Sequence, residues 1–172
     1  MSHPVYIIVA VDENFGMSKA GRLPWKLKKE MRYFATTTTK TTDPKKQNMV
    51  IMGRTTWESL GPKYQPLKNR KNVVLTSQSD FKAKGATVAH SLGEALLLAN
   101  SKIETIFILG GAKVFAEAVN LSQLRGIYLT KILHSYDCDI YFAGIPAKFS
   151  KIKKLGSEEE NGIKFEYLVY SK

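Results

Sequence analysis

Apolar residues form two kinds of pattern, one typical of strands and one typical of helices, and the two kinds alternate along the chain. Short apolar runs typical of strands occur at residues 5–11, 49–52, 72–76, 105–109, 126–133 and 164–170. Four helical patterns lie between them, at residues 25–35, 55–60, 91–99 and 112–119. Strands that alternate with helices favour an α/β fold with a mostly parallel central sheet of about eight strands, flanked by about four helices. No helical pattern separates the last two runs, so we expect them to pair antiparallel at one edge.

The remaining sequence indicates one domain over residues 1–172. The threonine-rich segment 36–42, followed by Asp43 and Pro44, is predicted to be a polar connector that is too short to link domains. A chain of 172 residues with 44% hydrophobic content can bury about 70% of its unfolded surface in one core.

The net charge indicates which ligands the chain would attract, and the cysteine count indicates the cellular compartment that suits it. The chain has 26 basic and 15 acidic side chains, a net charge of +11, which would attract nucleic acid, phosphate-rich cofactors or multiply carboxylated substrates. Cys138 is the only cysteine, which favours a reducing compartment, and we expect the cytoplasm. No apolar segment approaches the roughly 20 residues that span a bilayer, so we expect no membrane association and no export signal.

One carboxylate interrupts the apolar face of the first helical pattern. If a helix begins near Trp25, then Leu27, Glu30, Met31 and Phe34 share one face, and the basic side chains take the other. Burying a polar group without a partner costs roughly 2 to 7 kcal/mol. Glu30 therefore needs either a structural partner or a ligand.

Two strand-to-helix junctions combine glycine with groups that can hold a phosphate. In VIMGRTTW, Gly53 lets the backbone come close to a ligand, Arg54 supplies a cation, and Thr55 and Thr56 supply hydroxyls at a helix start. In FILGGAKVF, paired glycines precede a second helix. Neither is a GxGxxG fingerprint or a P-loop, so an ordinary Rossmann dehydrogenase or an NTPase is not supported.

Other catalytic chemistries lack their motifs. The sequence has no GxSxG elbow, no HExxH helix and no His, Cys, Asp or Glu cluster with metal-ligand spacing, so no metal is expected. A buried carboxylate and a dinucleotide-like cradle instead indicate proton-assisted hydride transfer.

Taken together and in order, these segments resemble the dihydrofolate reductase family over nearly the whole chain. The resemblance is carried by IIVAVDENFGMSKAGRLPW (first strand and lid loop), LPWKLKKE (substrate helix), MGRTTWESL and ILGGAKVF (cofactor junctions) and PLKNR (glutamate-tail site). The long segment between Phe34 and Met49 is closer to eukaryotic members. The resemblance implies hydride transfer from NADPH to 7,8-dihydrofolate, giving 5,6,7,8-tetrahydrofolate for one-carbon metabolism and nucleotide synthesis. It also implies a monomer that binds antifolate inhibitors.

The resemblance implies roles for individual residues. Glu30 would hold the pterin and help deliver a proton to N5, backed by a hydrogen bond from Thr130, with Trp25 and Leu23 as further catalytic positions. Arg70 would clamp the α-carboxylate of the substrate as a bidentate pair. The other substrate positions would be Ile8, Val9, Ala10, Met31, Phe34, Leu60, Leu67 and Leu109. The cofactor positions would be Ala10, Met17, Gly21, Arg22, Gly53, Arg54, Thr55, Thr56, Leu75, Thr76, Ser77, His90, Leu109, Gly110, Gly111, Ala112, Lys113, Val114 and Phe115, with a cis peptide between the two glycines.

Several positions depart from the family pattern. Ser18 stands where a glycine is usual in the lid loop, and Phe115 replaces a tyrosine beside the nicotinamide. Ser77 and His90 take places where many relatives have basic residues near the 2′-phosphate. These changes bear on turnover and cofactor preference more than on reaction type.

Three alternatives stay open at the level of sequence. A related reductase of the same fold could act on another pterin-like or pyrimidine compound, but a substrate without a glutamate tail has no need of Arg70. A basic nucleic-acid-binding module is motivated by the net charge alone, and the chain lacks a basic stripe interleaved with aromatics, so no dedicated nucleic-acid partner is expected. The third alternative is that the chain is an inactive member of the family.

Overall fold

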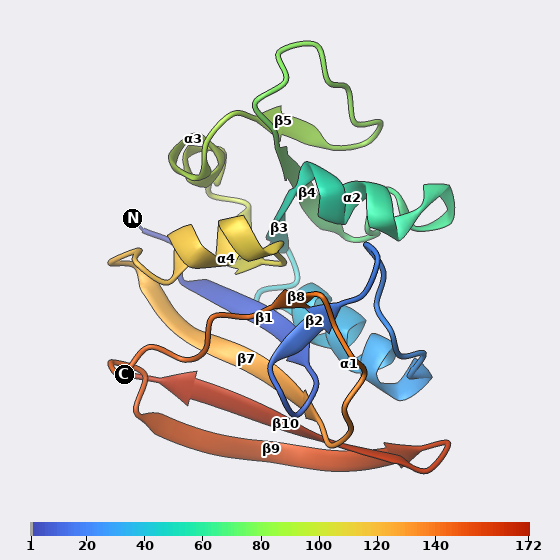
Figure 1. Ribbon diagram of the computed structural model, residues 1–172. Coiled ribbons are helices and arrows are strands. Elements are labelled where there is room, and N and C mark those ends of the chain that lie inside the picture. The colour runs from blue at the N-terminus through green and yellow to red at the C-terminus, as the bar shows by residue number, and fades with distance from the viewer. Residues whose placement is uncertain (1) are drawn as a thin grey trace.

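An eight-stranded sheet organises the computed structural model, which describes residues 2–172 (Figure 1). The strand order is β5-β4-β3-β6-β1-β7-β10-β9, and β2 pairs separately with β8. The bounds are β1 (Val5–Val11), β2 (Gly16–Ser18), β3 (Gln47–Gly53), β4 (Arg70–Leu75), β5 (Thr87–Ala89), β6 (Ile103–Ile108), β7 (Leu124–Ile132), β8 (Ile140–Tyr141), β9 (Lys151–Glu160) and β10 (Ile163–Ser171).

The pairing matches the predicted fold class. The strands from β5 through β7 in the sheet order pair in parallel, and β10 and β9 add an antiparallel edge. Each of the six predicted runs forms a strand. The long strand β9 was not predicted because it lies at the sheet edge and is exposed along most of its length, so it has no apolar run.

Helices cover both faces of the sheet: α1 (Lys28–Thr39), α2 (Arg54–Leu60), α3 (Leu92–Leu97) and α4 (Ala112–Ala118), with a short 3-10 turn η1 (Pro62–Tyr64). The expectation that the first helix begins near Trp25 is wrong. It begins at Lys28, because Leu27 has extended backbone and packs with Trp25 in a buried cluster.

The connector predicted at residues 36–42 is also wrong in its first half, because α1 continues to Thr39. The hydroxyls of Thr38 and Thr39 donate to the carbonyl oxygens of Phe34 and Ala35, at 2.8 and 2.7 Å. Threonine can satisfy its hydroxyl within a helix in this way, so a threonine-rich run is compatible with helix here.

The core is divided by the sheet. One cluster packs β-strand side chains against α3 and α4, and two further clusters pack them against α1, α2 and the segment before α1. Side chains alternate along β1, so Ile7 and Val9 belong to the first cluster, whereas Ile8 and Ala10 face α1 and α2. The side chain of Val9 therefore lies on the opposite face of the sheet from the side chains of Ile8 and Ala10.

Candidate active site

The carboxyl ends of the parallel strands gather most of the predicted positions. Gly53 ends β3, Leu75 ends β4, and His90 and Leu109 follow directly after β5 and β6. Ligands of open α/β sheets bind outside these carboxyl ends. No helix in the part of the chain described is long and apolar enough to cross a membrane.

Glu30 is a buried acid in the first turn of α1. Its exposed fraction is 6%, and burial raises its pKa from 4.5 to about 7, against a smaller lowering by a hydrogen bond with the Thr130 hydroxyl. Thr130 is itself buried in β7, where it pairs with Ala10 of β1. A carboxyl held this way is divided between its two protonation states near neutral pH, as a group that transfers protons requires.

The indole of Trp25 lies close to the same region. It is 4% exposed and packs in one cluster with Tyr167, Ala10 and Tyr33. Its Nε1–H is buried and has no partner among the described residues. A buried donor of this kind is satisfied by a ligand or an ordered water, which fits a substrate pocket.

An apolar wall comes together beside α1. Buried Ile8 and Leu67 share one cluster with partly buried Phe34, Leu60 and Leu109. These five residues come from two helices and three other segments, so the fold unites positions that are far apart in the sequence. Two further predicted residues are more open: Met31 on α1 is 46% exposed, and Leu23 before α1 is 51% exposed.

Arg70 begins β4 and is half-buried. Its Nε donates to the Lys68 carbonyl oxygen and its Nη1 to the Thr38 hydroxyl, both at 2.9 Å. Among the described residues no side chain partners its Nη2, so donors stay available for a carboxylate. Thr38 was not predicted as a site residue, although Glu30, Phe34 and Thr38 are spaced by four residues each and so share one helix face.

The two glycine junctions form one cradle. The amide of Gly53 donates to the carbonyl oxygen of Gly110 at 2.8 Å, and the peptide between Gly110 and Gly111 is cis, as the resemblance implies. A Cβ added at Gly111 would lie 3.5 Å from the Thr56 hydroxyl, and one added at Gly53 would lie 3.5 Å from Val114 Cγ2. The backbone of both junctions and the Thr56 hydroxyl are therefore adjacent.

A third group of predicted cofactor residues lies at and near the carboxyl ends of β4 and β5. The Thr76 amide donates to the Ala89 carbonyl oxygen, and the His90 Nδ1 lies 2.8 Å from the Thr76 carbonyl oxygen. Since a carbonyl only accepts, Nδ1 carries the proton and Nε2 is the nitrogen left for a ligand. Arg54 forms an ion pair with Glu58, with 2.9 Å between Nη1 and Oε1. Ser77 and Thr55 are exposed.

The other cofactor positions on α4 differ in exposure. Ala112 and Lys113 are exposed in its first turn. Phe115 is 4% exposed and packs edge-on against Phe142, with ring centroids 5.5 Å apart. A Cβ at Gly110 would lie 3.1 Å from its ring, so Phe115 packs directly under the cradle.

The lid loop, residues 12–23, is held by the loop that contains β8. Asp12 is 2% exposed and accepts hydrogen bonds from the amides of Gly16 and Tyr136, at 2.8 and 3.1 Å. Met17 is buried in β2, whereas Gly21 and Arg22 lie at an exposed tip, so the loop would have to bring these two to a ligand. Asp12 was not predicted from the sequence, because its amide partner in the second loop, Tyr136, lies 124 residues away.

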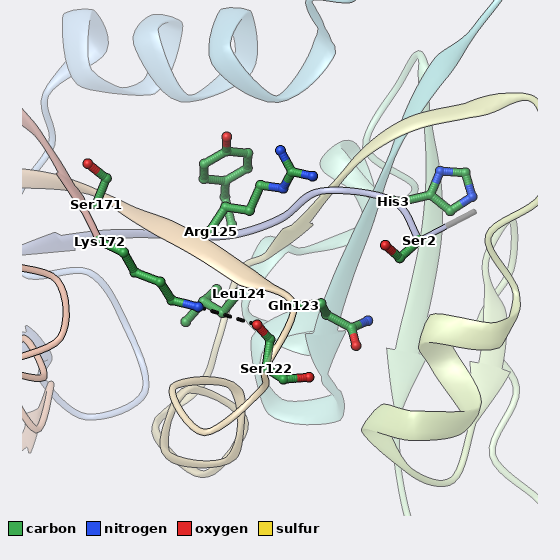
Figure 2. Close-up of a pocket in the computed structure, with 9 residues that line it drawn as sticks. Ser2, His3, Ser122, Gln123, Leu124, Arg125, Ser171 and Lys172 are labelled. Carbon is green, nitrogen blue, oxygen red and sulfur yellow. Dashed lines mark hydrogen bonds between the residues drawn. The ribbon is translucent and has the colours of Figure 1, made fainter.

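A separate hollow of about 520 Å³ lies at the amino ends of β1 and β7 (Figure 2). His3, Arg125 and Lys172 line it, and the Nζ of Lys172 donates to the Ser122 carbonyl oxygen at 3.3 Å. None of the predicted site residues lines it, so it is distinct from the candidate active site.

A family model described as dihydrofolate reductase matches residues 4–172. The chain belongs to the dihydrofolate reductase family. It is 42% identical over 175 residues to the dihydrofolate reductase of Drosophila melanogaster, covering 96% of each chain, and 38% identical over 187 residues to that of Bos taurus, covering 100% and 99%. The solved structure of Schistosoma mansoni dihydrofolate reductase superimposes with a TM-score of 0.84 at 38% identity, covering 99% of both chains.

Membership of the dihydrofolate reductase family confirms the resemblance and the fold class inferred from sequence. It makes the chain an oxidoreductase that works with a nucleotide cofactor and a small-molecule substrate. The individual site residues stay predictions, and the geometry described above is what supports them.

Proposed function

We propose that the chain catalyses hydride transfer from NADPH to 7,8-dihydrofolate, giving 5,6,7,8-tetrahydrofolate, with Glu30 assisting proton delivery. The observation that carries the proposal is the Glu30 carboxyl, buried against Thr130 with its pKa raised to about 7. An acid of this kind suits a reaction in which the hydride reaches C6 and a proton must reach N5 of the same C=N bond. The family relationship supports the same reaction.

The chain's own residues would orient the substrate and handle the proton. The Glu30 carboxyl would bind the amino group and ring nitrogen of the pterin, and would pass a proton toward N5 directly or through a water. Thr130 would hold that carboxyl in place, while Ile8, Phe34 and Leu67 exclude water from the benzoyl side. Excluding water strengthens every polar interaction within the site.

Arg70 favours a substrate with a glutamate tail. Its guanidinium is held by Lys68 and Thr38, which leaves Nη2 to pair with an α-carboxylate. A reductase that acts on a pyrimidine without such a tail has no use for a half-buried arginine at this position. The geometry thus supports dihydrofolate over the substrates of related reductases.

The residues at the strand ends fit a phosphate-bearing dinucleotide. At the Gly53 and Gly111 positions a side chain would narrow the space beside Thr56 and Val114, so glycine keeps backbone amides open to an incoming phosphate. NADPH supplies the hydride when it is bound. Thr56 and the Gly110–Gly111 backbone would hold its pyrophosphate, and Thr76, Ser77, His90 and Arg54 would face its adenosine end.

The direct test follows NADPH absorbance with purified protein, with and without dihydrofolate. We expect oxidation only when dihydrofolate is present, and a tight antifolate should stop it. NADPH oxidation without dihydrofolate, or none with it, would contradict the proposed reaction.

Cofactor preference should depend mainly on Arg54. NADPH differs from NADH by a 2′-phosphate, and Arg54 is the permanent cation among the residues assigned to that end. We therefore expect Arg54→Ala to reduce the ratio of NADH to NADPH dissociation constants far more than Ser77→Ala does. Glu58→Gln should raise that ratio, because it frees Arg54 from its ion pair. A wild-type ratio near one would contradict the NADPH assignment.

His90 should contribute to the same preference. Nε2 of His90 is free to face the phosphate, while Glu94 accepts from the His90 amide. We therefore expect His90→Gln to lower the ratio of NADH to NADPH dissociation constants, but by less than Arg54→Ala does. An unchanged ratio would remove His90 from the site.

The chain would act as a monomeric single domain over residues 1–172, in the cytoplasm. Its one cysteine, Cys138, is buried, and burial together with the nearby Asp12 raises the pKa of its thiol to about 11. A buried thiol that stays protonated is inert, which suits a reducing compartment. Sedimentation at micromolar concentration would test the monomer.

A further inference from the structure

Helix α1 has no capping side chain of its own. Leu27, the residue before it, has extended backbone and an apolar side chain that accepts no hydrogen bond. The first amides of a helix have no partner within the helix and need an acceptor from elsewhere. Glu30 is the third residue of α1, so the acceptor for these amides lies beside the proposed acid.

Glu160 supplies this acceptor from near the other end of the chain. It is the last residue of β9, and its carboxylate accepts hydrogen bonds from the amides of Lys28 and Lys29, both at 2.8 Å. The Nζ of Lys29 also donates to the Glu159 carbonyl oxygen, at 3.1 Å. The bond from the Lys29 amide, followed by that from Lys28, holds the pKa of Glu160 below its usual range, so this carboxylate is ionised at neutral pH.

A second contact joins the β9–β10 hairpin to the same helix. Tyr167 of β10 stacks on Tyr33 of α1, with ring centroids 3.8 Å apart and an interplanar angle of 17°. The Tyr167 hydroxyl donates to Glu158 of β9, and Tyr167 pairs with Thr130 across the β10–β7 ladder. The hairpin thus contacts α1 before and after Glu30, and it also adjoins the strand that carries Thr130.

We propose that Glu160 is a positioning residue that holds the Glu30 carboxyl in place for proton delivery. The inference rests on the proposed role of Glu30. Two oxygens on two consecutive amides fix both the rotation and the axial position of the first helical turn, and Glu30 is the next residue. A misplacement of about 1 Å in a catalytic group can slow a reaction about 100-fold.

The groups that face each carboxyl set the expected pH behaviour. Lys28 and Lys29 of α1 face Glu160. Glu30 is faced by Thr130 of β7, by Tyr33 of its own helix and by Tyr167 of β10. Thr130 lowers the pKa of Glu30, so a displaced Glu30 would lose this bond and its pKa would rise.

The test measures hydride transfer by rapid mixing as a function of pH. We expect Glu160→Gln to slow transfer about tenfold at pH 7, to shift the midpoint of the pH profile upward and to leave NADPH binding unchanged. Glu159→Gln is the matched control, because it removes the same charge one residue away and keeps its carbonyl contact with Lys29. It should behave as wild type. In a Thr130→Ala background, Glu160→Gln should not move the midpoint, because the bond that it would weaken is already absent.

Two results would overturn the inference. Equal shifts in the two glutamine variants would show a surface-charge effect, and a lower melting temperature with an unchanged pH profile would show a helix cap alone. If Glu160→Gln fails to fold, the same measurements are made on Glu160→Asp, which keeps the negative charge on a side chain that is one methylene shorter. Glu30→Gln is measured in the same series, since a fully active Glu30→Gln variant would refute the proposed acid independently of Glu160.

Discussion

Replacing Glu30 with glutamine is expected to reduce the rate of dihydrofolate reduction at neutral pH by about 100-fold or more, because the amide cannot exchange the proton that N5 requires. The defect should shrink as the pH falls, since the substrate then arrives protonated at N5 from the solvent more often. The measurement is the hydride-transfer rate of wild type and variant from about pH 5 to 8. A variant with near-normal activity at neutral pH would show that Glu30 is not the acid.

The same substitution should stabilise the fold above neutral pH. Burial raises the pKa of Glu30 from 4.5 to about 7, so the folded state binds a proton that the unfolded state releases. The contribution of this group to stability therefore falls as the pH rises from 4.5 to about 7, and above that it is a constant penalty of at most about 3 kcal/mol. Glu30→Gln removes the ionisation, so denaturant titrations at pH 8 should show equal or greater stability. If Glu30→Gln were less stable than wild type at pH 8, damage to the fold would explain its lost activity.

Most of the fold was predictable because its elements carry local signals. The parallel strands inside the sheet are largely buried and read as apolar runs, whereas the short edge strand β5 is partly exposed and does not. Each helix after the first follows a glycine or serine signal. Strand β9 carries no such signal, because an edge strand meets solvent along its length. The end of α1 was misjudged because threonine usually competes with helix, whereas here Thr38 and Thr39 bond back to their own helix.

The candidate site was predictable where a residue is of a type that its local sequence pattern does not favour. A charge within an apolar helix face identified Glu30, and glycines at two strand ends identified the cradle. The residues that support the site are of ordinary types for their positions. Glu160 is one acid in a run of three, and its role depends on amides 132 and 131 residues away in the sequence. Asp12 depends in the same way on the amide of Tyr136, 124 residues distant. Contacts of this range are fixed by the topology of the sheet and not by local sequence.

Replacing Arg70 with alanine is expected to weaken dihydrofolate binding by about 2 to 5 kcal/mol, because it breaks a charge-assisted pair in a partly closed cleft. NADPH binding should barely change, since Arg70 lies at the start of β4 and the cofactor residues lie at its other end. Thr38→Val should weaken dihydrofolate binding in the same direction but less, because it removes only the hydroxyl that orients Nη1. A pteridine substrate that lacks the glutamate tail should bind wild type and Arg70→Ala equally, which isolates the carboxylate as the group that Arg70 recognises. Titrations of both ligands and of the truncated substrate give all three comparisons. Equal weakening of both full ligands, or of neither, would instead favour a reductase whose substrate has no tail.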